Sequence, residues 1–303
     1  MIKKITLLIL FLLIIACGAE TIKKDSEFEP IIVKEPEPIT EPKVEKVFVK
    51  TLKEAPAGYP KKISQISEDE YGKVKAKLEL FVSKQCKPVK WDGGGMEQTK
   101  AFSVRLDHFG YLESLSCYNL PEGDVSGTSV EKVAKDHLKN YERYLGIENV
   151  NLEFLDYRNV GQNFFISTKP QMYKEILVFD GSTGSAQPAI INLVMTKTDM
   201  LTGLNGHYYA NIEVPVKPVI TLDQVNDNLF GEDISFANEE GKKVEKKVNK
   251  NDLKYTGNLI ILAHTNKNLE YRLVWQIPIS FGWTSYVDAI TGEVLSITQD
   301  FLT

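Results

Sequence analysis

Histidine is scarce in this chain, and its spacing excludes the commonest catalytic zinc motif. The four histidines are His108, His137, His207 and His264. No two of them have the i, i+4 spacing of H-E-x-x-H, which places two metal ligands on one face of a helix. The sequence also lacks G-x-S-x-G, G-x-G-x-x-G and a P-loop, because the glycines at 93–95 precede no Lys-Ser or Lys-Thr pair. We therefore expect no enzyme, no metal site and no cofactor.

An excess of positive charge is also missing. The chain has 36 Lys and Arg residues against 41 Asp and Glu residues, and its formal net charge is −5. A mildly acidic chain gives no reason to expect nucleic acid or an anionic membrane surface as a partner. Hydrophobic residues make up 43% of the sequence, which is typical of a globular protein with a core. At about 100–200 residues per domain, the length predicts two or three small domains.

Long hydrophobic runs are absent as well. The apolar run near the N-terminus, Ile5–Ala16, has 12 residues, whereas a membrane-spanning helix needs roughly 18–20. Because it follows Lys3 and Lys4, it predicts a secretory signal peptide over residues 1–16. The run ends in Ile-Ile-Ala followed by Cys17, which resembles the bacterial lipobox, where the cysteine receives lipid and becomes the new N-terminus. We expect lipidation of Cys17; the alternative is a plain signal peptide in which Cys17 is incidental.

The predicted leader implies a location in the bacterial cell envelope, with the lipid as the contact to a membrane. Acyl chains contribute about 0.8 kcal/mol per buried CH₂, and several chains give a stable anchor. Gly18 and Ala19 stand where an aspartate often retains such proteins in the inner membrane. We therefore favour the outer membrane or the cell surface over the inner membrane.

Apolar residues are few in the segment that follows the cysteine. Pro30, Pro36, Pro38 and Pro42 alternate there with Glu and Lys. Such a segment cannot bury enough apolar surface to offset the entropy lost on ordering, and its prolines favour an extended, semi-stiff chain. Residues 17–60 are predicted to be a lipidated cysteine followed by a disordered tether.

Cysteine is rare too, with three in the whole chain. Beyond Cys17 only Cys86 and Cys117 remain. In an exported protein, two cysteines form a disulfide more often than not. We predict a Cys86–Cys117 disulfide; the alternative is two buried free thiols.

Three places carry a similar signal for the start of a helix, since residues 67–70, 128–131 and 221–224 each fit the capping box S/T-x-x-E/Q. The second leads into an apolar face at helical spacing that is closed by Gly146. The third predicts a short helix, Leu222–Phe230, closed by Gly231. After the first, the apolar residues fit either a helix or an alternating strand, and the cap favours the helix.

Segments typical of strands follow each capped stretch, separated by turns that contain glycine, among them Thr202-Gly203 and Asn205-Gly206. These segments are Phe102–Leu106, Tyr111–Tyr118, Asn151–Asn159, Asn163–Thr168, Met172–Phe179, Ala189–Lys197, His207–Val214, Leu259–Thr265, Leu269–Ile279, Thr284–Asp288 and Glu293–Gln299. The pattern predicts an α+β fold of tandem modules, each a helix packed on an antiparallel meander. The expected modules are an N-terminal α+β unit over 61–122, a second over 128–216 and a third over 218–303.

The last module resembles the PepSY domain. Its hallmark is a Tyr-Arg-Leu-x-Trp strand followed by a strand that ends in V-D-A-x-T-G-x-V. The matching residues are Tyr271, Arg272, Leu273, Trp275, Val287, Asp288, Ala289, Thr291, Gly292 and Val294. The 128–216 module is similar to the FTP domain that precedes PepSY in propeptides of thermolysin-like peptidases, with Tyr173, Val178 and Phe179 matching. The motif residues Tyr271, Arg272, Trp275, Asp288, Thr291 and Gly292 are interpreted as structural, since Gly292 allows the turn and Asp288 can accept hydrogen bonds within it.

The resemblance implies a binding role without catalysis. FTP and PepSY domains attached to peptidases assist folding of the enzyme and block its activity. A version without the peptidase would be an envelope lipoprotein that binds protein partners and inhibits or chaperones a secreted or envelope peptidase. The alternative is a structural or host-interaction lipoprotein, similar to an adhesin, that uses the same modules as spacers or adhesive surfaces.

Overall fold

A computed structural model gives the fold. It describes residues 48–86, 101–117, 129–147, 152–182, 186–237, 242–253, 256–265, 267–280 and 282–300. Residues Val47–Thr303 form one compact unit, separate from Met1–Lys46. Cys17, the signal peptide and most of the tether lie outside the described residues. In the part that is described, no helix is both long enough and apolar enough to cross a membrane.

Of the three helices in the described residues, two begin with the predicted capping box. Before α1, Glu68–Ser83, the Ser67 hydroxyl accepts from the Glu70 N–H, and the Glu70 carboxylate accepts from the Ser67 N–H. Thr221 and Gln224 make the same reciprocal pair before α3, Leu222–Leu229. The helix interpretation of the first stretch is therefore confirmed over the strand.

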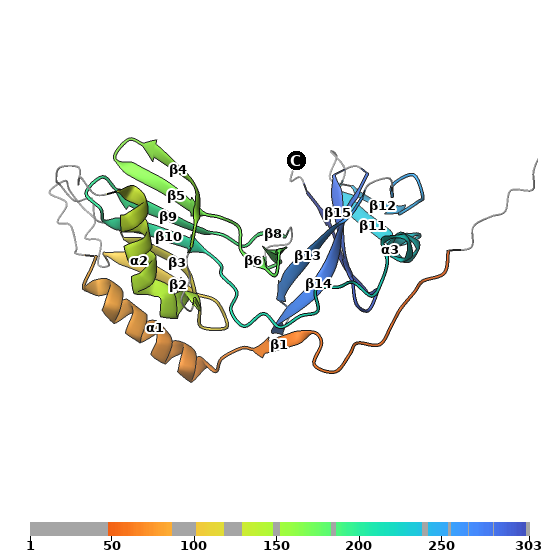
Figure 1. Ribbon diagram of the computed structural model, residues 1–303, viewed down its shortest axis with the longest axis horizontal. Coiled ribbons are helices and arrows are strands. Elements are labelled where there is room, and N and C mark those ends of the chain that lie inside the picture. Colours follow the sequence, from red (N-terminus) through yellow and green to blue (C-terminus); the bar gives the residue numbers. More distant parts are fainter. Residues whose placement is uncertain are drawn as a thin grey trace, which may run out of the picture. The chain divides into compact units, whose positions relative to one another are not determined.

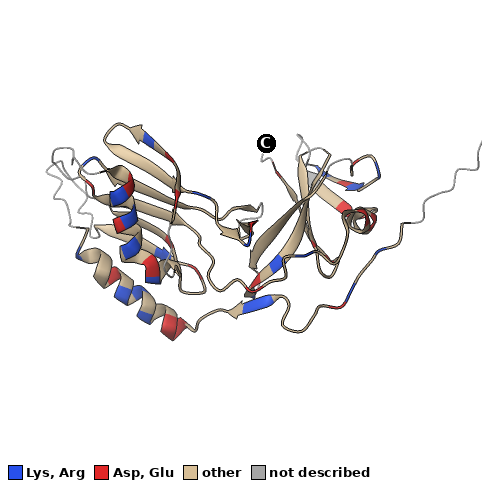
Figure 2. Ribbon diagram, viewed as in Figure 1, with Lys and Arg blue, Asp and Glu red and all other residues tan. Residues whose placement is uncertain are grey.

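Helix α2, Val130–Leu145, is amphipathic. It follows Ser129, whose side chain makes no cap hydrogen bond, and it ends at Gly146, which has φ of +70°. Its outer face carries charges of both signs (Figure 2), including the ion pairs Lys132–Asp136 and Lys135–Glu131 at i, i+4 spacing. Its inner face is apolar and buried, as the sequence periodicity predicted.

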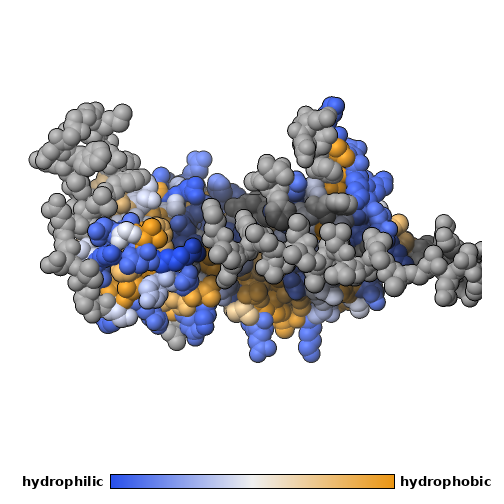
Figure 3. Space-filling view, turned by 90° about the horizontal axis from the view of Figure 1, so that it is seen from above, coloured by the Kyte–Doolittle hydropathy of each residue, from blue (hydrophilic) through white to orange (hydrophobic). Residues whose placement is uncertain are grey.

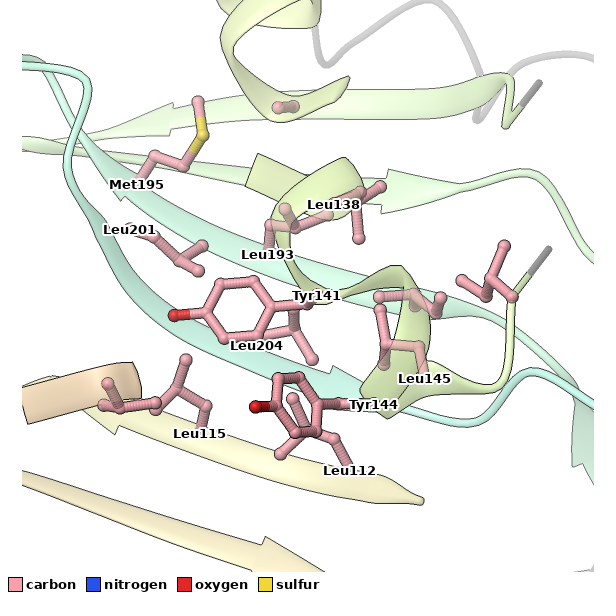
Figure 4. Packing of buried hydrophobic residues seen from close by; sticks show 14 of the residues in the cluster. Leu112, Leu115, Leu138, Tyr141, Tyr144, Leu145, Leu193, Met195, Leu201 and Leu204 are labelled. Carbon is pink, nitrogen blue, oxygen red and sulfur yellow. The ribbon is translucent and has the colours of Figure 1, made fainter. Parts of the chain in front are cut away.

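The first sheet has six strands, and every neighbouring pair is antiparallel. Its order is β2 (Phe102–Leu106), β3 (Leu112–Cys117), β10 (Leu201–Gly206), β9 (Ile191–Thr196), β5 (Asn163–Thr168) and β4 (Phe154–Val160). Helix α2 lies across this sheet (Figure 1). Side chains of α1, α2 and the sheet form one hydrophobic core, and Figure 4 shows Tyr141 and Tyr144 of α2 among leucines of β3, β9 and β10. A fully buried leucine contributes about 1.5–3 kcal/mol to such a core.

The predicted disulfide is present. Cys86, just after α1, bonds to Cys117 at the end of β3, with a Cα–Cα distance of 5.6 Å, well inside the range for disulfides. The bond therefore ties α1 to the sheet on which it packs.

Strand β10 corrects the interpretation of two glycines as turn residues. Gly203 and Gly206 lie inside this strand. A β-bulge follows Leu201, and a Cβ on Gly203 would lie 3.3 Å from the side chain of Val194 on β9. The glycines permit close approach of neighbouring backbones in a strand, a role that local sequence does not separate from turn formation.

The second sheet has eight strands and is built from distant parts of the chain. Its main path is β16 (Val294–Gln299), β15 (Trp283–Asp288), β14 (Asn268–Ile279), β13 (Asn258–Thr265), β7 (Ile176–Asp180) and β6 (Met172–Tyr173). Two more strands join it, with β1 (Lys61–Ser64) paired to β14 and β8 (Gln187–Pro188) paired to β7. A separate hairpin, β11 (Asp233–Ala237) and β12 (Lys243–Lys247), follows α3.

Both sheets combine strands from more than one of the predicted modules. Strands β2 and β3, from the 61–122 unit, extend the sheet of the 128–216 module. Strands β6, β7 and β8, from the 128–216 module, join the last sheet, where β7 lies parallel to β13. The α+β class is confirmed. Strand pairing joins residues far apart in sequence, and the domain boundaries stay a prediction.

Two local predictions are also corrected. Residues 48–60, assigned to the disordered tether, contact the second sheet, and Tyr59 there is buried. Residues 207–214, predicted as a strand, form none. Instead, the Gln171 side chain accepts from the Tyr209 N–H at 2.9 Å and donates to the Tyr209 carbonyl at 2.7 Å, which replaces a strand partner.

Candidate functional site

A fully buried carboxylate organises the turn between β15 and β16. One oxygen of Asp288, Oδ1, accepts the N–H groups of Ile290 at 2.8 Å and Thr291 at 2.9 Å. The other, Oδ2, accepts the Tyr59 hydroxyl and Arg272 Nη1, each at 3.0 Å. Burying a charge is costly unless it is paired and hydrogen-bonded. Four donors meet that requirement, so this carboxylate holds structure together.

Arg272 on β14 links Asp288 to two further carboxylates. Its Nε and Nη2 donate to Glu270 at 2.9 and 2.7 Å, and its Nη1 donates to Glu293 at 3.1 Å. Lys62 of β1 pairs with Glu270 at 2.9 Å. Burial acts to raise the pKa of the Glu270 carboxyl, but hydrogen bonds from Lys62 and Arg272 outweigh burial and hold that pKa below its usual value. The charged side chains of this group are therefore paired with one another.

Tyr59 connects this array to the segment before β1. Its hydroxyl donates to Asp288 and accepts from the Leu273 N–H at 3.1 Å. Burial, and next the nearby Asp288 carboxylate, raise the pKa of the Tyr59 hydroxyl above its usual value. Tyr59 therefore stays a neutral hydrogen-bond donor at physiological pH.

We call residues 48–60 the strap, because they run along α3 and the Asp288 turn. The Asn228 side chain of α3 accepts from the Thr51 N–H at 2.6 Å and donates to the Thr51 carbonyl at 2.9 Å. It also donates to the Gly292 carbonyl at 2.8 Å. The Phe48 ring stacks on Phe230 with centroids 3.8 Å apart. One buried asparagine thus fastens both the strap and the turn.

Gly292 meets two demands at once. Its φ is +81°, a conformation that favours glycine. A Cβ at this position would lie 2.3 Å from the Thr51 carbonyl oxygen of the strap. The glycine of the motif therefore permits both the turn and the passage of the strap over it.

The aromatic residues of the motif also make internal contacts. The Tyr271 hydroxyl donates to the Ala210 carbonyl at 3.0 Å, and Trp275 Nε1 donates to the Ile220 carbonyl at 2.9 Å. Both carbonyls belong to the segment between β10 and α3. These hydrogen bonds hold that segment on β14.

A second group of titratable side chains lies among Asp107, Asp180, His207 and Tyr209. His207 Nδ1 is 3.6 Å from an Asp180 carboxylate oxygen and 3.2 Å from the Tyr209 hydroxyl. Asp107 accepts the N–H groups of Phe109 and Tyr111 at 2.8 and 2.9 Å, yet burial raises the pKa of its carboxyl above the usual value. Asp180 and Tyr209 thus contact His207, and Asp107 holds the β2–β3 turn through its two backbone hydrogen bonds.

The described residues offer little to hold a metal or cofactor. In this part of the chain, no three His, Cys, Asp or Glu side chains are placed to share a metal ion. A hollow of about 460 Å³ lies beside Tyr111, Arg143 and Asn211. The Arg143 guanidinium in its wall already covers the Tyr144 ring at 4.4 Å and donates to that hydroxyl. Glu142 lines the hollow as well.

A group of exposed apolar side chains lies on β4 and β5. Leu155, Tyr157 and Val160 of β4 are 64, 64 and 58% exposed, and Phe165 of β5 is 44% exposed. Within the described residues, β4 pairs with β5 alone and forms the edge of its sheet (Figure 1). Seen from above Figure 1, the surface mixes apolar and charged side chains (Figure 3). An edge strand has backbone N–H and C=O groups free to pair with another chain, so β4 is the candidate binding surface.

The structure thus brings Tyr271, Arg272, Trp275, Asp288, Thr291 and Gly292 together around one strand and one turn. Reasoning from the sequence missed Tyr59 and Asn228, which connect that turn to the strap. It also missed the exposed side chains of β4, because edge position depends on the strand order of the whole sheet. The alternation of Leu155 and Tyr157 with charged residues was the only local signal.

Comparisons with known proteins do not identify a family. No protein-family model matches the chain, and no curated protein matches it. Among solved structures, the Bacillus megaterium YpeB C-terminal domain matches with 12% identity and a TM-score of 0.33, over 78% of this chain and 98% of that chain. We draw no argument from a TM-score this low. The PepSY and FTP resemblances therefore rest on the sequence motifs.

Proposed function

We propose that this protein is a non-catalytic lipoprotein of the cell envelope that binds another protein through the free edge of β4. The observation that carries the proposal is the exposed apolar edge itself, formed by Leu155, Tyr157 and Val160. Isolated apolar residues on a surface are ordinary, but a group of them on an unpaired strand edge is typical of a binding surface.

The state of the polar groups supports a binding role. The buried charges around Asp288 and Arg272 are paired with one another, and the groups around His207 are likewise bonded internally. Catalysis requires groups that face a substrate in a cleft. The edge of β4, in contrast, has groups that face solvent along the six exposed residues 155–160.

Strand addition is the mode of binding that fits this edge. An extended segment of a partner can pair with β4 through backbone hydrogen bonds, while its alternate side chains contact Leu155 and Tyr157. Such segments occur in flexible regions of many proteins. The PepSY and FTP resemblances suggest a secreted or envelope peptidase as the partner, which this protein would inhibit or chaperone.

The test measures cleavage of casein by a thermolysin-like peptidase secreted by the same cells, with and without this protein. We expect the wild-type chain to slow cleavage and Leu155→Lys to lose that effect, since the lysine adds a charge to the apolar edge. Leu80→Lys is the matched control, because Leu80 lies on α1 and is 62% exposed, close to the 64% of Leu155. Unchanged cleavage with wild-type protein, or equal inhibition by both variants, would count against the proposal.

A further inference from the structure

We infer that the partner at the β4 edge includes a second copy of this chain, paired antiparallel to β4 with Tyr157 opposite Tyr157. This inference rests on the proposed binding role of β4 and names an occupant for it. Its basis is the sequence of the strand, Phe-Leu-Asp-Tyr-Arg-Asn-Val. Asp156 and Arg158 flank Tyr157 symmetrically, so a two-fold axis at Tyr157 places each charge opposite its counter-charge.

The charges lie where such a pairing needs them. Asp156 and Arg158 are two residues apart, so both side chains lie on the same face of the strand. Arg158 Nε already donates to Asp156 Oδ2 at 3.2 Å, and the two side chains are 80 and 54% exposed. In the dimer, two such pairs meet and form an array of four alternating charges. Opposite charges directly across an antiparallel pair stabilise it.

The neighbouring antiparallel registers of two β4 strands, and their in-register parallel pairing, place like charges together. If the axis moves by one residue, Arg158 faces Arg158 or Asp156 faces Asp156. An in-register parallel pair has both of these contacts. Like charges directly opposite each other destabilise a strand pair, so the charges favour the register centred on Tyr157.

The backbone of β4 is suited to this register. Pairing between β4 and β5 is regular from Asp156 to Val160, and its one bulge lies between Phe154 and Asp156. The strand contains neither proline nor lysine, the residues that most often protect an edge from pairing. A second copy covers the exposed ring of Tyr157 and satisfies the free backbone groups. The partner segment and the second copy compete for the same edge.

A single strand pair is a small interface, and small interfaces give weak, transient dimers. We therefore expect a dissociation constant of roughly 1–100 µM. The measurement is sedimentation equilibrium on a chain that begins at residue 18. The hydrophobic clusters of the described residues come from residues 59–297, so this chain keeps that core.

The decisive experiment reverses one charge at a time. In Asp156→Arg both positions are positive, and in Arg158→Asp both are negative, so each variant alone has like charges across the axis. We expect the dissociation constant of each variant to be at least about tenfold higher than that of the wild type. An equimolar mixture restores every opposite-charge contact, so it should recover the dimer mass. Both sites are exposed, and the urea midpoint of each variant checks that the fold is kept.

Recovery in the mixture but not in the separate variants supports the inference. Wild-type protein that stays monomeric at about 200 µM, well above the expected range, overturns it. Dimers that persist in both single variants also overturn it, because they form elsewhere. In either case the peptidase assay with Leu155→Lys still decides the proposed function, so the two ideas fail separately.

Discussion

Replacing Asp288 by asparagine keeps the shape of the side chain and removes its charge. The asparagine oxygen can still accept the N–H groups of Ile290 and Thr291. Its NH₂ group, however, faces the Tyr59 hydroxyl and Arg272 Nη1, which are both donors to Oδ2 in the native protein. The substitution therefore turns the Arg272 hydrogen bond into a donor–donor contact and removes the acceptor of the Tyr59 hydroxyl, in a fully buried place.

The size of the expected stability loss depends on the carboxylate partners that Arg272 keeps. Breaking a buried ion pair by removing one partner costs about 3–5 kcal/mol when the remaining charge is left alone. Arg272 keeps Glu270 and Glu293, so its share of the cost is smaller. The Tyr59 hydroxyl loses its acceptor, which costs about 1–3 kcal/mol. Together with the reduced cost at Arg272, we expect Asp288→Asn to lower the free energy of unfolding by about 2–4 kcal/mol. That is a large part of the 5–15 kcal/mol typical of a domain.

The assay is urea denaturation followed by tryptophan fluorescence, since Trp275 and Trp283 pack in the same region. The control is Asp69→Asn on α1, where the aspartate side chain is 86% exposed and pairs with Lys73 at the surface. We expect that control to change stability by less than about 0.5 kcal/mol. A loss below about 1 kcal/mol for Asp288→Asn would refute the account of the buried carboxylate.

Three further predictions concern the strap, the disulfide and pH. In urea denaturation, Gly292→Ala should lower the free energy of unfolding by at least about 2 kcal/mol more than Gly231→Ala does. Both glycines have φ of +81°, but of the two only Gly292 would bring a Cβ against the strap. Equal losses of stability would contradict the contact with the strap. Replacing both cysteines of the Cys86–Cys117 bond with alanine should cost about 3–4 kcal/mol for a 31-residue separation, and a loss under about 1 kcal/mol would contradict it. Because the pKa of Asp107 is raised in the folded state, its carboxyl stabilises the fold below the ordinary carboxyl pKa, and this stabilisation is lost as pH rises through the folded pKa. We expect Asp107→Asn to remove this pH-dependent loss when the free energy of unfolding is measured across a series of pH values. The same pH dependence in the variant and the wild type would contradict the prediction.

The sequence predicted the elements that are determined by contacts between residues close together in the chain. The capping pairs Ser67–Glu70 and Thr221–Gln224 fixed the starts of α1 and α3, because the hydrogen bonds that make a cap join residues three apart. The turn at Asp288 was predicted for the same reason. The α+β class followed from the succession of such elements.

Distant pairing explains what sequence reasoning missed. Strand β7 pairs with β13 across about eighty residues of chain, so no local pattern shows that the modules share a sheet. The strap was assigned to the tether because its neighbours are rich in proline, whereas Asn228 and Tyr59 order it through contacts across more than 170 residues. The exposure of β4 depends on its place at the end of the strand order.

The central claim is that the β4 edge binds protein, and a photocrosslinking residue placed on that edge tests it most directly. The measurement compares the full-length protein with the crosslinker at position 157 and at position 80, irradiated in intact cells. The account predicts protein adducts from position 157, containing a peptidase or a second copy of this chain, and few from position 80. Absence of adducts at position 157, or equal adducts at both positions, would contradict it.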